Sequence, residues 1–118
     1  ASMMVNEGLP MYLVDRMDRR FELKNLTVGI LGMAFKAESD DIRSSLSYKL
    51  RRILRYKAAN VLCTDPFVKT DPNLVPLEEV LAKADVLVIG APHSVYRSLK
   101  PKQAVVDIWN LLGNGVLV

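Results

Sequence analysis

The sequence predicts an α/β domain in which an open parallel sheet of four or five strands carries helices on both faces. Two patterns support this prediction. Short runs that are apolar throughout alternate with segments of helical periodicity, and strands buried on both faces are typical of parallel sheets. The length of 118 residues, half of them hydrophobic and a quarter charged, suits one globular domain.

The first expected element is an N-terminal helix over residues 6–21. Pro10 lies in its first turn, where a missing N–H is harmless. Leu13, Val14 and Met17 recur at helical spacing and form one apolar stripe. The helix precedes the first strand, so it either covers the sheet or ends a longer element of a larger protein.

Four apolar runs are expected to be strands, over residues 26–31, 60–64, 85–90 and 103–108. Residues 116–118 could begin a fifth strand after a turn at 110–115. Cys63 lies within the second run. A reactive thiol needs an accessible, electropositive site, so a small core residue is the alternative that this position favours.

Helices are expected between the strands. Ser44 or Ser45 can cap a helix that ends near Lys57. A second helix begins at Pro76, and a short one follows over residues 94–99. The first of these helices has basic residues that form either a polyanion patch or a solvated face: Lys49, Arg51, Arg52, Arg55 and Lys57.

Right-handed crossovers leave few arrangements for these strands. The simplest has the order 2-1-3-4, which is Rossmann-like, with the winding reversed between the first and third strands. Ligands bind at the carboxyl ends of strands at such a reversal. Those ends carry the loop over residues 32–43 and the segment 91–93, which contains His93. His93 is either part of a site there or a structural residue.

The loop over residues 32–43 is the strongest candidate for a ligand-binding site. Lys36 suits a phosphate or polar sugar group, and Arg43 offers a planar fork to an anion near a helix start. Phe35 could stack on a base or pack beneath the loop. Asp40 and Asp41 could accept backbone N–H bonds and hold the loop. A solvated connection without a ligand is the alternative.

Several kinds of site are excluded. No Gly-x-Gly-x-x-Gly follows a strand, and no Walker sequence or nucleophile elbow occurs. One Cys and one His allow neither a disulfide nor a Cys- or His-based metal site. We therefore expect no metal. The net charge of +3 and the few aromatics do not indicate nucleic-acid binding, and no apolar run reaches the ~20 residues of a membrane span.

Several segments together resemble the C-terminal, nucleotide-binding domain of the UDP-glucose/GDP-mannose dehydrogenase family. They are Gly-Ile-Leu-Gly-Met-Ala-Phe-Lys at 29–36, Asp-Asp-Ile-Arg-Ser-Ser at 40–45, Asp-Pro at 65–66, Ala-Pro-His at 91–93 and Val-Asp at 106–107. The resemblance implies a nucleotide-sugar (UDP) binding domain over residues 23–118. Residues 1–22 then resemble the end of the family's central inter-domain helix, through which a homodimer is expected.

The resemblance also implies a parent enzyme that oxidises the C6 alcohol of a UDP-sugar to a carboxylate with NAD, in cytoplasmic polysaccharide biosynthesis. Phe35 and Lys36 inherit contacts with the UDP-sugar, and His93 is expected in the same substrate site. Arg43 inherits a contact with NAD, which is held mainly by an N-terminal domain of the parent chain. That domain and the catalytic Cys have no match here, so no catalytic residue is expected and the chain alone should be inactive.

One departure from the family's sequence pattern leaves the identity of the sugar undetermined. Many family members have Asp-Gly-Arg near the chain end, where this sequence has Asp107, Ile108 and Trp109. The alternative function is a stand-alone, flavodoxin-like domain that binds a phosphorylated small molecule or a partner protein. An exposed stripe on the first helix would favour the severed enzyme domain, and a buried one the stand-alone domain.

Overall fold

The computed structural model describes residues 8–36, 38–39, 41–42, 45–109 and 111. Its centre is one parallel sheet of four strands in the order β2-β1-β3-β4, as the sequence predicts. The strands are β1 (Thr27–Leu31), β2 (Asn60–Thr64), β3 (Val86–Ile89) and β4 (Ala104–Val106). The predicted fifth strand and most of the turn before it lie outside the described residues.

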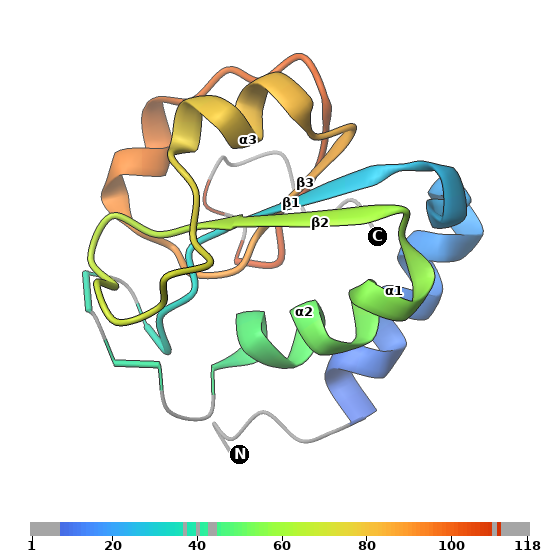
Figure 1. Cartoon of the computed structure of the whole chain (residues 1–118), viewed down its shortest axis with the longest axis horizontal. Coiled ribbons are helices and arrows are strands. Elements are labelled where there is room, and N and C mark those ends of the chain that lie inside the picture. Colours follow the sequence, from blue (N-terminus) through green and yellow to red (C-terminus); the bar gives the residue numbers. More distant parts are fainter. Residues whose placement is uncertain (1–7, 37, 40, 43–44, 110, 112–118) are drawn as a thin grey trace.

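Helices cover both faces of this sheet (Figure 1). Helices α1 (Gly8–Phe21) and α2 (Leu46–Lys57) lie on one face, and α3 (Leu77–Lys83) lies on the other. Two short 3-10 helices, η1 (Leu23–Asn25) and η2 (Ser94–Ser98), complete the described elements. Of these helices, none combines the length and apolar composition that crossing a bilayer requires.

The central strands are almost entirely apolar, and both of their faces are covered. Val28 and Ile30 of β1 belong to the core beneath α1 and α2. Leu31 of β1 and Leu87 of β3 belong to the core beneath α3. Successive side chains on a strand point to opposite faces, so an uninterrupted apolar run fills two cores at once.

Helix α3 lies very close to β1 at Gly29. A Cβ atom added at Gly29 would lie 2.4 Å from Cγ1 of Val80 and 3.0 Å from Cβ of Ala84. Gly29 therefore allows a close approach of the helix to the strand.

The apolar stripe of α1 is buried. Leu13, Val14 and Met17 belong to the same core as β1, and α1 packs chiefly against α2. Met11 and Tyr12, on the outer side of α1, are exposed. The expectation of an exposed stripe, attached to the severed enzyme domain, is therefore wrong. The core of this domain includes α1 as an integral layer.

Candidate functional site

The carboxyl ends of β1, β2 and β3 meet at one edge of the sheet. Gly32 ends β1 with φ of +93°, in the left-handed region that glycine adopts without strain. Its N–H donates to the carbonyl of Thr64 over 2.8 Å. A Cβ at Gly32 would lie only 2.7–2.8 Å from atoms of Ala91. The loops that follow the three strands therefore begin in direct contact.

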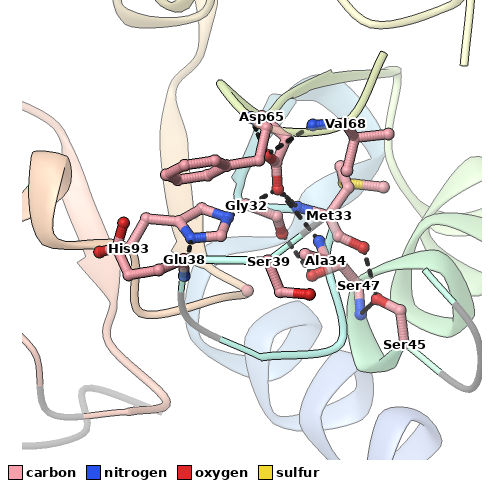
Figure 2. Close-up of polar contacts among 12 residues, drawn as sticks. Gly32, Met33, Ala34, Glu38, Ser39, Ser45, Ser47, Asp65, Val68 and His93 are labelled. Carbon is pink, nitrogen blue, oxygen red and sulfur yellow. Dashed lines mark hydrogen bonds and ion pairs between the residues drawn. The ribbon is translucent and has the colours of Figure 1, made fainter. Parts of the chain in front are cut away.

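The carboxylate of Asp65 joins these loops. Its Oδ2 accepts from the N–H groups of Met33 and Ala34 over 2.7 and 3.0 Å. Its Oδ1 accepts from the N–H groups of Phe67 and Val68 over 2.7 and 3.2 Å. Figure 2 shows Asp65 between Met33 and Val68, with its side chain directed at the start of the loop after β1. One buried side chain thus fixes the backbone of two loops.

The environment of Asp65 favours the ionised carboxylate. Burial alone would raise the pKa of Asp65. Hydrogen bonds from His93 and from the backbone of Phe67 and Met33 outweigh the burial, so the pKa of Asp65 lies below its ordinary value. A carboxylate that accepts several N–H bonds stays charged at neutral pH.

His93 extends this network to the third loop. Its ring is fully buried, and Nε2 lies 2.8 Å from Oδ2 of Asp65. Its Nδ1 accepts from the backbone N–H of Glu38 over 2.8 Å. The ring of Phe67 packs against the imidazole with the two centroids 4.8 Å apart. Figure 2 shows the imidazole between Asp65 and Glu38. Both nitrogens of the ring therefore have partners within the protein.

The first turn of α2 is bonded to the same loop. Ser45 caps the helix by accepting from the N–H of Ser47 over 3.1 Å, as the sequence predicts. The hydroxyl of Ser45 donates to the carbonyl of Met33 over 2.7 Å, and that of Ser47 donates to the carbonyl of Gly32 over 2.5 Å. The loop base and the helix start form one hydrogen-bonded unit.

The predicted ligand residues stand at the tip of this loop. Lys36 is exposed, and Phe35 has 40% of its surface exposed. The loop is closed by a hydrogen bond from the N–H of Phe35 to the carbonyl of Asp41. Arg43 and Asp40 lie outside the described residues. Phe35 and Lys36 are thus available to a ligand on a loop whose base is fixed.

Trp109 lies near the same edge of the sheet. Its Nε1–H donates to the carbonyl of Gly90 over 3.1 Å, and 43% of the residue is exposed. An indole ring therefore stands at the position where the resemblance led us to look for an arginine.

The surroundings of Cys63 and of the basic residues on α2 distinguish between the alternatives that the sequence left open for them. Cys63 is buried, and burial raises the pKa of its thiol to about 11, which agrees with a core residue. On α2, Arg51 forms an ion pair with Asp71 over 3.0 Å, and Tyr48 donates to the same carboxylate over 2.7 Å. Part of the basic face of α2 is therefore structural.

The described residues offer no place for a metal ion, since no group of three or more His, Cys, Asp or Glu residues among them is suitably arranged. The turn after β1 also does not fit the pyrophosphate of NAD. A dinucleotide fold uses its glycines there to let the ligand approach the backbone. At Gly32 the space of a Cβ is instead filled by Ala91 of the same chain.

Residues 29–114 match the model of the UDP-glucose/GDP-mannose dehydrogenase family, UDP binding domain. The chain belongs to this family. Among its relatives, an NDP-N-acetyl-D-galactosaminuronic acid dehydrogenase from Ralstonia solanacearum is 31% identical over 105 residues. That match covers 80% of this chain and 24% of the relative.

Solved structures of family members have the same fold. A UDP-glucose dehydrogenase from Pyrobaculum islandicum superimposes with a TM-score of 0.75 at 27% identity, over 86% of this chain and 26% of that protein. An NDP-N-acetyl-D-galactosaminuronic acid dehydrogenase from Methanosarcina mazei Go1 gives 0.67 at 33% identity, over 80% and 21%. This chain therefore spans about a quarter of the length of the family members it matches.

Within this UDP-binding domain, sequence reasoning missed two residues of the site. Asp65 entered only as part of the Asp-Pro segment in the family resemblance, with no role in the site, and Glu38 was given no role. The available signal was the position of Asp65, directly after a strand that neighbours the central one. Carboxylates at that edge of a parallel sheet lie close to the loop of the next strand.

Proposed function

We propose that this chain binds the nucleotide part of a UDP-sugar for a longer NAD-dependent 6-dehydrogenase. The observation that carries the proposal is the pair Phe35 and Lys36, exposed on a loop whose base Asp65 fixes. Lys36 would contact the diphosphate, and Phe35 would pack against the base or ribose. Membership of a UDP-binding domain family supports this ligand class.

The remaining parts of the enzyme are proposed from the family. NAD would be held by an N-terminal domain of the parent protein, with Arg43 reaching it from this domain. The chain as given would not reduce NAD, because hydride transfer requires the nicotinamide to be held against the substrate carbon. The parent enzyme would act in the cytoplasm, in polysaccharide biosynthesis, and would dimerise through the region that includes residues 1–22.

Titration calorimetry with UDP tests the binding function. A charged hydrogen bond contributes about 1.5–3 kcal/mol, and a millimolar dissociation constant corresponds to about 4 kcal/mol. We therefore expect millimolar affinity. Lys36→Ala should weaken it about tenfold or more, since 1.4 kcal/mol is a factor of ten.

Lys102→Ala is the matched control. Lys102 is also exposed but precedes β4, at the opposite edge of the parallel sheet. Equal affinities of the Lys36 and Lys102 variants, with the fold intact by circular dichroism, would contradict the proposed site. NADH formation by the chain with a UDP-sugar would contradict its inactivity.

A second candidate function is a stand-alone domain that binds a phosphorylated small molecule or a partner protein. The burial of Leu13, Val14 and Met17 favours it, because α1 then needs no further domain to cover its apolar stripe. Titration with inorganic phosphate and with UDP separates the two functions. Equal affinity for both ligands would favour the stand-alone domain, and a clear preference for UDP the enzyme domain.

A further inference from the structure

His93 makes a contact that the proposed function leaves unused. Its Nδ1 accepts from the backbone N–H of Glu38, two residues after Lys36. A backbone N–H can only donate, so Nδ1 must carry a lone pair. The ring proton is then on Nε2, where it is donated to Asp65. The geometry thus assigns a neutral imidazole with its proton on Nε2.

Glu38 needs an external partner to keep its conformation. Its φ of +56° lies in the left-handed region, which is uncommon for a residue other than glycine. Besides its bond to His93, Glu38 accepts from the N–H of Ser94 with its carboxylate. The loop that carries Phe35 and Lys36 is therefore tied at Glu38 to two adjacent residues after β3.

We propose that His93 is a positioning residue for nucleotide-sugar binding, which holds the loop of Phe35 and Lys36 through the backbone of Glu38. This proposal rests on the proposed function of that loop. His93 itself is fully buried, with both nitrogens engaged, so it acts without touching the nucleotide. Asp65 has the matching role from the other side, since it sets the tautomer of His93 and the backbone before Phe35.

The test measures the UDP affinity of the wild type, His93→Gln and His93→Ala by calorimetry at pH 8. Glutamine carries one acceptor and one donor in its amide, so it can replace both contacts of the imidazole. We expect His93→Ala to bind about tenfold more weakly than the wild type, the equivalent of one ordinary hydrogen bond, and His93→Gln to recover most of the loss.

The affinity that His93→Gln recovers relative to His93→Ala is the readout. Proton–nitrogen NMR of the wild type follows the Glu38 amide during the addition of UDP and requires no variant. That amide should shift as UDP occupies the loop.

The two proposals fail in different ways. A wild type that binds no UDP at pH 8 contradicts the proposed function, whatever the Glu38 amide shows. UDP binding that is equal in the wild type and His93→Ala contradicts the positioning role alone. A His93→Gln variant that recovers none of the affinity lost in His93→Ala, or a Glu38 amide that does not move when UDP is added, also contradicts it.

Discussion

Nε2 of His93 donates to Oδ2 of Asp65 over 2.8 Å, and both side chains are fully buried. This pair joins the loops that follow β1, β2 and β3. The contributions of this pair to the stability of the fold and to UDP affinity can be measured separately.

Asp65→Asn should lower the free energy of unfolding by about 3 kcal/mol, the usual cost of removing one partner from a buried charged network. The amide has a donor where Oδ2 accepts three hydrogen bonds. Urea denaturation measures the loss. Asp85→Asn is the control, because Asp85 is exposed and its Oδ2 accepts from the backbone N–H of Thr27. Similar losses in the two variants would contradict the central role of Asp65.

Acid should remove the stabilisation that Asp65 provides. Its pKa in the folded protein lies below its ordinary value of 3.8, so folding favours the ionised form. The contribution is complete above the ordinary pKa and is lost as the pH falls through the folded-state pKa. Urea midpoints of the wild type and Asp65→Asn should therefore converge as the pH falls below the ordinary value of 3.8. A constant difference over that range would be inconsistent with this mechanism.

Gly29→Ala should destabilise the domain by about 1–3 kcal/mol, the usual range for overpacking. The added Cβ would lie 2.4 Å from Cγ1 of Val80. Val80→Ala removes that atom, so the double variant should be at least ~0.5 kcal/mol more stable than the sum of the single losses predicts. Rescue is partial because Ala84 and Leu87 also lie within 3.1 Å of the new Cβ. Strict additivity in urea denaturation would show that the strain lies elsewhere.

Met17→Ala on α1 should cost about 2–5 kcal/mol, as for other buried methionines. Met17 is fully buried in the core between the sheet and helices α1 and α2. Met11→Ala is a matched control on the same helix, since Met11 is 63% exposed and should change stability by less than about 0.5 kcal/mol. Thermal or urea unfolding provides the comparison. A small effect at both positions would indicate that α1 adds little to this domain.

The sequence was sufficient for the sheet because its signals are local. The strands centre on short apolar runs, such as Val86–Ile89, which are typical of strands buried on both faces. The handedness of crossovers left few strand orders, and the simplest of them is the one observed. Ser44 or Ser45 was predicted as a helix cap, and Ser45 has this role because its side chain accepts from a donor two residues away.

The site was less predictable because its contacts are not local. Asp65 reaches Met33 and His93, which are 32 and 28 residues away in the chain. An Asp-Pro pair after a strand has the same appearance whether the carboxylate faces solvent or anchors a neighbouring loop. The left-handed conformation of Glu38 likewise depends on its partners after β3. Phe35, Lys36 and Arg43 could be proposed from their own chemistry, without knowledge of such distant contacts.

The dense bonding at the end of β1 also has a consequence for protein engineering. The backbone from Gly32 to Ala34 is held by Thr64, Asp65, Ser45 and Ser47 through its own amides and carbonyls. None of these bonds involves the side chain of a tip residue. Segments between Ala34 and Ser45 that keep Glu38 could therefore be exchanged between family members as cassettes, because the contacts of Glu38 with His93 and Ser94 would be preserved. Such exchanges give a route to new nucleotide-sugar preferences.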